Sequence, residues 1–186
     1  MSEKKDEACS GVRPGAEDPH PFPLTLFLRP RKDFFVMKLM EFLIPDAIES
    51  NMKSNTKTEA IRELVALLKK AGAITDEESV FKIVLEREEL GSTGIGDGIA
   101  VPHGKSNAVD KVAASFGRSV KGINFESLDN QPAYLFFLLV APIGSSGPHL
   151  MALARISRLL KSKDFRDNLM KAKGKPDILK ILQSED

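Results

Sequence analysis

The chain has 186 residues, of which 42% are hydrophobic and 28% charged, a composition typical of one globular domain with a buried core. Its 27 basic and 26 acidic residues nearly cancel, and it holds one tyrosine and no tryptophan, which argues against a nucleic-acid-binding protein. The single cysteine, Cys9, can form neither an internal disulfide nor a metal cluster, so we expect a reducing, cytoplasmic location.

No apolar segment is long enough to cross a membrane or to direct export. The longest, Ala133–Ala141, is far shorter than the roughly 20 residues of a transmembrane helix. The first residues mix acids with lysines, and the apolar segment Leu24–Leu28 is too short for a signal peptide. We therefore expect no membrane insertion.

Residues 1–36 contain five of the 11 prolines, mixed with charged residues, and this pattern predicts a flexible N-terminal extension. Met37 is an alternative start of the protein. His20 lies between two prolines of this segment, and we expect no chemical role for it. The globular domain is predicted to span residues 37–186.

Two helices are predicted first. Thr56–Glu59 has the sequence of a capping box, and apolar residues then recur at helical spacing until Gly72. Thr75–Glu78 opens a second helix in the same way. That helix continues to Leu90, so Arg87 is expected in its last turn.

A glycine-rich segment, Gly91–Gly104, holds five of the 13 glycines. Ile99 and Val101 alternate with a small residue and predict a short strand. Because Pro102 lacks a backbone N–H, this strand is expected to end at His103, whose side chain then faces an opening. Three further strands are expected at 112–116, 123–125 and 133–141, the last of them central and buried on both faces.

The chain closes with a helix and two shorter amphipathic segments. Pro148 suits the first position of the helix, which places His149 in its first turn. The shorter segments are 165–170 and 176–182. Because strands and helices intermix, the sequence predicts an α/β fold with a mixed β-sheet flanked by helices.

The glycine-rich segment fits neither common nucleotide-binding motif. Five residues, not the four of a P-loop, separate Gly98 from Gly104, and Pro102 removes an N–H that would hold phosphate. The dinucleotide motif G-x-G-x-x-G also fails, because its last glycine is replaced by Ile99.

A metal centre is not expected either. His103 and His149 would supply two ligands, and the predicted domain has no cysteine or further histidine to complete a zinc site.

His103 is the best candidate for chemistry. A neutral imidazole that is hydrogen-bonded through one nitrogen can present the lone pair of the other to phosphorus. Arg87 offers a bidentate grip on phosphoryl oxygens, and His149 lies in the first turn of a helix, where it can act as a neutral donor. From the residues alone, structural roles remain open for all three: Arg87 as a solvated helix end, His149 as a core histidine and His103 as a loop histidine.

The segment Leu90–Gly104, LGSTGIGDGIAVPHG, resembles the active-site signature of enzyme IIA proteins of the phosphotransferase system (PTS), in the fructose/mannitol class. The resemblance extends over about residues 37–182 and includes Arg87 and the segment His149–Leu160. It implies a single PTS EIIA type-2 domain of mixed α/β fold, without a metal or nucleotide cofactor. As a free-standing domain, the chain most resembles the nitrogen-regulatory (PtsN-type) subgroup.

The resemblance also implies a function, that of a phosphoryl carrier. His103 matches the histidine that accepts phosphate, through Nε2, from a phosphorylated histidine carrier protein (HPr or NPr). Arg87 and His149 match the arginine and second histidine beside it. We expect a nitrogen-related regulatory role, exerted on regulatory target proteins. The alternatives are a sugar-specific IIA that passes phosphate to a IIB component for fructose or mannitol uptake, and a docking module in which His103 is not phosphorylated. Asp97 adds a negative charge to the glycine-rich loop. Two roles stay open for it: a capping residue, or a group that tunes the electrostatics of the phosphorylated form.

Overall fold

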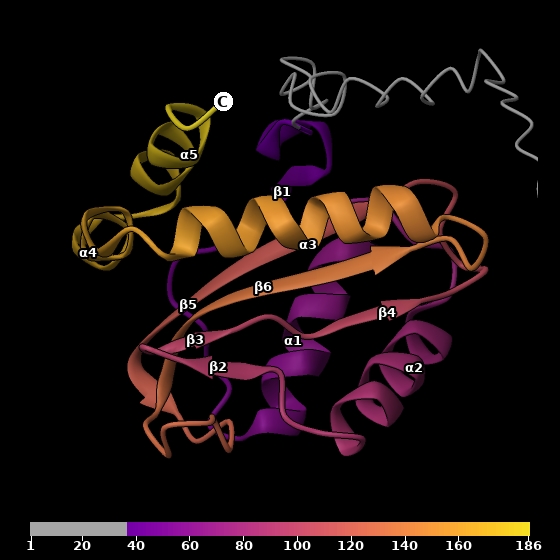
Figure 1. Ribbon diagram of the computed structural model, residues 1–186, viewed down its shortest axis with the longest axis horizontal. Helices are drawn as coiled ribbons and strands as arrows, with labels where there is room; N and C mark the ends of the chain where they lie inside the picture. The colour runs from indigo at the N-terminus through magenta and orange to yellow at the C-terminus, as the bar shows by residue number, and fades with distance from the viewer. Residues whose placement is uncertain (1–36) are drawn as a thin grey trace, which may run out of the picture. The chain divides into compact units, whose positions relative to one another are not determined.

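The structure, a computed structural model, describes residues 37–186, which form a six-stranded sheet with helices packed against it (Figure 1). The predicted extension, with Cys9 and His20, lies outside the described residues. The elements in chain order are the 3-10 helix η2 (Leu39–Glu41), β1 (Leu43–Glu49), α1 (Lys57–Lys70), α2 (Glu77–Glu89), β2 (Gly94–Gly96), β3 (Ile99–Ala100), β4 (His103–Lys105), β5 (Ala113–Ile123), β6 (Ala133–Ala141), α3 (Ser146–Leu160), α4 (Lys163–Lys171) and α5 (Lys175–Gln183).

The sheet is mixed. Its strand order is β1-β5-β6-β3-β2, and β4 also pairs with β6. β1 runs parallel to β5, β5 runs antiparallel to β6, and β3 and β4 both run parallel to β6. β3 and β4 therefore pair one after the other along the same edge of β6. The predicted α/β fold with a mixed β-sheet flanked by helices is confirmed.

Side chains of β6 alternate between two hydrophobic clusters on opposite faces of the sheet. Phe137 and Leu139 belong to the cluster that includes residues of α3, α4 and α5. Phe136 and Leu138 belong to the cluster that includes residues of α1 and α2. Apart from Tyr134, every residue of β6 is buried, so the prediction of a central strand buried on both faces is confirmed. Figure 1 shows α3 lying along β6.

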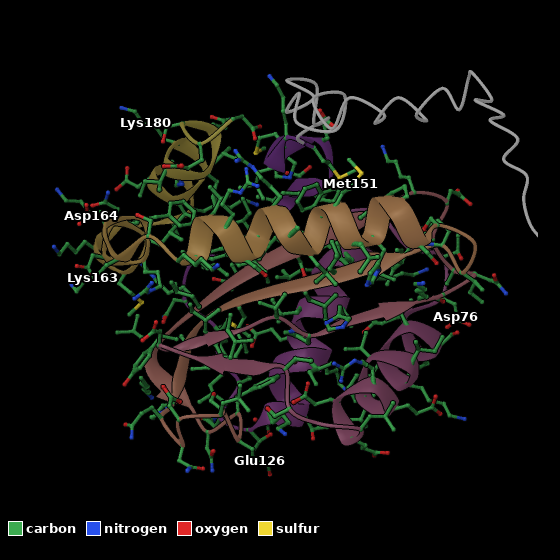
Figure 2. All side chains as sticks on the ribbon, in the orientation of Figure 1. Asp76, Glu126, Met151, Lys163, Asp164 and Lys180 are labelled. Carbon is green, nitrogen blue, oxygen red and sulfur yellow. The ribbon has the colours of Figure 1, made fainter. Side chains whose placement is uncertain are left out.

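The helices begin close to where the sequence predicts. At α1 the capping box is complete, since the Thr56 side chain accepts from the Glu59 N–H and the Glu59 carboxylate accepts from the Thr56 N–H. At α2 the predicted box at Thr75 is wrong by one residue. The cap is Asp76, labelled in Figure 2, whose carboxylate accepts from the Ser79 N–H at 3.0 Å. The amphipathic segments at 165–170 and 176–182 are confirmed as α4 and α5.

Two strand predictions are wrong because of local hydrogen bonding. The strand expected to end at His103 stops at Ala100, and β4 starts at His103. Although Pro102 has no N–H, its carbonyl accepts from the Leu139 N–H at 2.9 Å, so contact with β6 is kept across the interruption. The strand expected at 123–125 does not form either, because Ile123 is the last residue of β5, which is much longer than the predicted 112–116.

β1 is not predicted by the pattern of its residues. Pro45 interrupts the alternation and cannot donate to a sheet. β1 lies at the edge of the sheet, and its register with β5 shifts between Leu43 and Ile48, which accommodates a residue without an N–H.

Candidate functional site

β4 positions His103. In the parallel pairing with β6, His103 stands beside Leu139, and both side chains point to the face of the sheet that α3 covers. Gly104 points to the other face, towards α2. A Cβ at Gly104 would lie 3.0 Å from the Ile83 Cγ2 atom and 3.2 Å from the Val84 Cγ2 atom, so glycine is needed for α2 to pack directly on β4.

The His103 ring is held by a backbone carbonyl. Its Nδ1 atom lies 2.9 Å from the Val101 carbonyl oxygen, which can only accept a hydrogen bond. The proton of the neutral ring is therefore on Nδ1, and the lone pair of Nε2 is free. The ring is half-buried. This geometry satisfies the expectation that one nitrogen is occupied while the other is available.

The charge of His103 is set by opposing effects. Burial of the ring lowers its pKa below the usual value, and the nearby Arg87 charge lowers it further. The hydrogen bond to Val101 and the charge of Glu88 oppose this change without cancelling it. The imidazole is therefore neutral at pH 7 and can act as a nucleophile.

His149 comes next to His103 from α3. The ring centroids are 5.6 Å apart, and the rings meet edge to face at 61°. His149 is only 5% exposed, and burial lowers its pKa to about 4, with the charges of His103 and Lys105 acting in the same direction. Within residues 37–186 its Nδ1 atom is buried and has no hydrogen-bond partner. His149 is consequently a neutral ring at pH 7.

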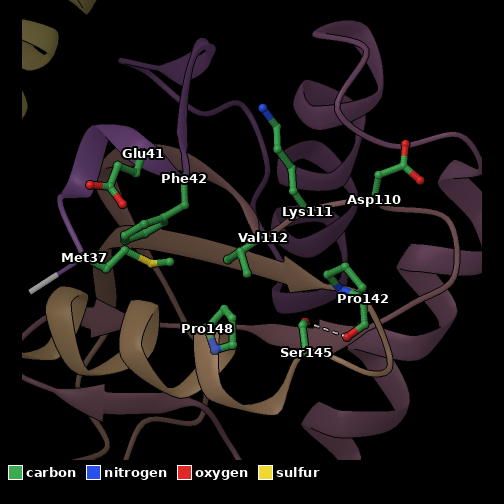
Figure 3. Close-up of a pocket in the computed structure, with 9 residues that line it drawn as sticks. All are labelled: Met37, Glu41, Phe42, Asp110, Lys111, Val112, Pro142, Ser145 and Pro148. Atoms are coloured by element: carbon green, nitrogen blue, oxygen red, sulfur yellow. Dashed lines mark hydrogen bonds between the residues drawn. The ribbon is translucent and has the colours of Figure 1, made fainter. Parts of the chain in front are cut away.

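The start of α3 is fixed by the loop that follows β6. The Ser145 hydroxyl donates to the Pro142 carbonyl at 2.8 Å, as Figure 3 shows, and the Ser145 carbonyl accepts from the His149 N–H at 3.1 Å. The predicted first position for Pro148 is wrong, since α3 begins two residues earlier at Ser146, while His149 stays in the first turn. The pocket drawn in Figure 3, of about 330 Å³, lies beside this loop, and none of the three predicted site residues lines it.

Arg87 lies in the last turn of α2, as predicted. Its Nη1 atom donates to the Gly91 carbonyl at 3.1 Å, which ties the end of the helix to the glycine-rich segment. The effect of the Arg87 guanidinium on the His103 imidazole is exerted through its charge. The structure thus brings His103 and His149 into ring contact, with Arg87 close enough to influence the charge of His103.

Asp97 belongs to the tight turn between β2 and β3. Gly96, Asp97 and Gly98 have φ angles of 91°, 54° and 76°, in the left-handed region that glycine adopts without strain. The Asp97 N–H donates to the Asp129 carboxylate at 3.0 Å, and the Asp97 carboxylate lies 3.5 Å from the Arg166 Nη2 atom of α4. Asp97 is a turn residue, and its carboxylate pairs with Arg166.

Two residues near the site are missed by sequence reasoning. Lys105 shares the face of β4 with His103, and its Nζ atom donates to the Ser146 hydroxyl at the start of α3 at 2.9 Å. Glu88 is a buried carboxylate of α2, 4% exposed. Signals for both exist in the sequence: Lys105 follows His103 by two, the period of a strand, and Glu88 continues the helical stripe of Phe81 and Val84.

Among residues 37–186 no three His, Cys, Asp or Glu side chains come together where a metal ion could be held. In the same range, no helix has both the length and the apolar character needed to span a bilayer.

Comparison with known proteins supplies the family. Residues 41–185 match the model of the family described as phosphoenolpyruvate-dependent sugar phosphotransferase system, EIIA 2. A fructose-specific EIIABC component of the PTS from Bacillus subtilis is 41% identical over 81% of this chain, which spans only 24% of that protein. A nitrogen regulatory protein from Bradyrhizobium diazoefficiens is also 41% identical, over 78% of this chain and 95% of that protein.

Solved structures agree with this match. The nitrogen regulatory protein IIA-Ntr from Neisseria meningitidis has a TM-score of 0.71 and 30% identity, covering 76% of this chain and 97% of its own. IIA mannitol from Escherichia coli, solved in complex with phosphorylated IIB mannitol, has a TM-score of 0.65 and 25% identity, covering 75% of this chain and 95% of its own. Together with the family match over most of the chain, these similarities show that the protein belongs to the EIIA type-2 family of the phosphotransferase system, whose members relay phosphoryl groups between proteins.

Proposed function

We propose that the phosphoryl group carried by this protein is attached to Nε2 of His103. The Nε2 lone pair attacks the phosphorus held by a histidine of an HPr-type or NPr-type phosphocarrier protein. The donor's P–N bond breaks as the new P–Nε2 bond forms, and the electron pair of the broken bond returns to the donor imidazole. The reverse of this step, towards a different partner, releases the phosphoryl group.

The observation that carries the proposal is the 2.9 Å contact between His103 Nδ1 and the Val101 carbonyl oxygen. It leaves the lone pair of Nε2 free before transfer. The same carbonyl oxygen remains a hydrogen-bond acceptor for Nδ1–H after phosphate is attached at Nε2, when this N–H is more acidic than in the free neutral ring. The phosphoryl group can therefore be taken up and released without moving the ring proton.

Arg87 and His149 support the transfer from two sides. Phosphoryl transfer needs positioning and positive or N–H partners for the three equatorial oxygens. Arg87 supplies a permanent charge from the end of α2, while the neutral His149 ring, 5.6 Å from His103 between ring centroids, can donate from the start of α3. Both groups come from elements that the sheet holds in place.

The partners and the location follow from the same role. A donor of the HPr or NPr type and a cytoplasmic location fit a PTS carrier domain, which we place at residues 37–186 on the basis of the match at 41–185. A nitrogen-related regulatory role is supported by the relative from Bradyrhizobium diazoefficiens, which is a nitrogen regulatory protein. Transfer to a IIB component is the second candidate, because the fructose-specific relative from Bacillus subtilis is equally identical.

Reconstitution of the phosphate relay tests the proposal. Purified protein is incubated with phosphoenolpyruvate, enzyme I and an HPr-type or NPr-type carrier, and the product is analysed by intact mass and by ³¹P and ¹⁵N NMR. We expect one acid-labile phosphate on Nε2 of His103. It should be absent from His103→Ala and present in His20→Ala, a control that keeps the other histidines. A His103→Ala variant that is labelled like wild type would refute the proposal.

The second candidate is tested with the phosphorylated protein. Rapid loss of the phosphate to a fructose-type IIB protein would favour a sugar-specific role. Retention of the phosphate in the presence of IIB would favour the regulatory role. A chain that never takes up phosphate from the carrier would instead support the docking module.

A further inference from the structure

Glu88 is a buried carboxylate that the proposed transfer does not yet use. Its side chain is only 2% exposed. The Lys57 Nζ atom, at the start of α1, lies 3.3 Å from the Glu88 Oε1 atom and 2.6 Å from Glu126. Burial of a carboxylate is costly unless a cation and hydrogen-bond donors compensate for it, and Lys57 is that cation. Glu88 is therefore a buried hydrogen-bond acceptor with a cation beside it.

Thr93, in the glycine-rich segment, donates to this acceptor from both its backbone N–H and its hydroxyl. Both Glu88 carboxylate oxygens lie 3.0 Å from the Thr93 backbone N, and the Thr93 hydroxyl donates to Oε2 at 2.5 Å. Thr93 is itself 5% exposed. Hydrogen bonds to an ionised acceptor are stronger than those between neutral groups. The end of α2 thus clamps the segment just before β2.

The clamp continues to the imidazole through two further hydrogen bonds, one between backbone groups and one from the ring of His103. The Thr93 carbonyl accepts from the Val101 N–H at 3.0 Å. The Val101 carbonyl then accepts from Nδ1 of His103 at 2.9 Å. Val101 lies between β3 and β4, outside the residue pairs that join either strand to β6, and these two contacts hold its N–H and its carbonyl. The orientation of the carbonyl that selects the His103 tautomer is therefore linked to Glu88.

We propose that Glu88 is a positioning residue for phosphotransfer: through Thr93 and Val101 it fixes the carbonyl that keeps the proton of His103 on Nδ1 and the lone pair on Nε2. It acts through other groups and does not touch the phosphoryl group. This inference rests on the proposed function in one respect, that His103 is the residue phosphorylated.

The tests use two substitutions of different severity and one matched control. Glu88→Gln keeps the shape of the side chain but removes the charge and replaces one acceptor oxygen by an amide donor. Thr93→Val removes only the hydroxyl and keeps the backbone N–H. Glu89→Gln makes the same chemical change at the adjacent helix position, where the side chain is exposed.

The first measurement is the tautomer of His103, read from the ¹⁵N shifts of its ring nitrogens in histidine-labelled protein at pH 8, without any phosphate donor. We expect wild type and Glu89→Gln to be mainly Nδ1–H. In Glu88→Gln the Nε2–H form should rise to a comparable population, and Thr93→Val should change in the same direction by less. Circular dichroism checks that each variant is folded.

The second measurement is transfer from the phosphocarrier protein. For Glu88→Gln we expect kcat to fall about tenfold or more while KM for the carrier changes less than twofold, because the docking surface is not altered. An unchanged tautomer in folded Glu88→Gln would overturn the inference, and so would unchanged kcat. If Glu88→Gln does not fold, the same two criteria apply to Thr93→Val. Wild-type protein without phosphate on His103 would refute the proposed function, whereas a normal wild type with an unresponsive tautomer would refute only the role of Glu88.

Discussion

The titration of His149 makes the free energy of unfolding depend on pH, and this contribution can be separated from that of other groups by comparing two proteins. The folded protein keeps this buried ring neutral, with its pKa lowered from 6.5 to about 4 by burial first and by His103 and Lys105 next. In the unfolded chain the ring protonates near pH 6.5. Acidification therefore protonates the unfolded state first, and the stability contributed by neutral His149 is complete above pH 6.5 and is lost as the pH falls towards 4.

The size of the effect follows from the shift. Each unit of pKa difference is worth about 1.4 kcal/mol. The loss between pH 7 and pH 4 is therefore about 3 kcal/mol, a large part of the roughly 5–15 kcal/mol that a domain of this size has. Other groups titrate over the same range, so the effect must be measured as a difference between two proteins.

The assay is urea unfolding of wild type and His149→Gln at several pH values from 7 to 4. Glutamine keeps a polar, neutral side chain and does not titrate. We expect the advantage of wild type over His149→Gln to shrink by about 3 kcal/mol across this range, with most of the change below pH 6.5. Parallel stability curves for the two proteins would show that His149 titrates normally and would refute the reasoning.

Three further predictions concern the elements around the site. Arg87→Lys keeps the charge but loses the planar donor fork, and we expect a roughly tenfold lower kcat for transfer with unchanged urea stability, measured with the reconstituted relay; an unchanged kcat would remove the arginine from the mechanism. Gly104→Val should cost about 1–3 kcal/mol, seen in urea unfolding, because its side chain would push Ile83 and the rest of α2 away from β4; wild-type stability would contradict this. Arg118→Met should cost about 3 kcal/mol, because the buried guanidinium donates to three carbonyls at the end of α4, yet transfer by the folded variant at low temperature should be normal. A variant as stable as wild type would show that those carbonyls find other donors.

The parts of the fold that could be predicted are those in which a residue and its chain neighbours determine the outcome. The capping box of α1 and its apolar stripe need only residues within a few turns. β6 is recognisable because nearly every one of its side chains is buried, whichever strands lie beside it. The position of Arg87 in the last turn of α2 follows from the glycine that ends the helix.

The parts that could not be predicted depend on partners far along the chain. β1 contains Pro45 and forms a strand because it pairs with β5. It tolerates the proline because it is an edge strand of the described sheet, with no second partner that needs the missing N–H. Pro102 separates β3 from β4, but both strands pair with the same edge of β6, because the Pro102 carbonyl accepts from the Leu139 N–H. The local effect of a proline predicts that a strand ends before Pro102, but it does not predict that β4 begins at His103.

The same distinction holds for the site. The residue types of Arg87, His103 and His149 are compatible both with phosphoryl chemistry and with structural roles, and the resemblance to PTS EIIA proteins is what makes the hypothesis specific. The identity of the group on Nδ1 of His103 is not readable from the sequence, because the Val101 carbonyl is a backbone atom present at every residue. Glu88 is missed for a related reason: its acceptor role exists only once the glycine-rich segment folds back onto α2.

The neutral state of both imidazoles bears on how a carrier releases what it accepts. A group that stabilises bound phosphate and the transition state equally does not speed transfer, and a fully cationic site would hold the phosphoryl group in its resting state. Here burial keeps His149 neutral at pH 7, and the Lys105 ammonium donates to Ser146 at the start of α3. The cation that acts on the His103 imidazole is Arg87, at a helix end tied to the glycine-rich segment. In the proposed mechanism Arg87 and neutral donors face the phosphoryl group, while the Lys105 ammonium is directed to Ser146. Such a site can therefore support the charge that develops during transfer without making phosphorylated His103 a thermodynamic trap.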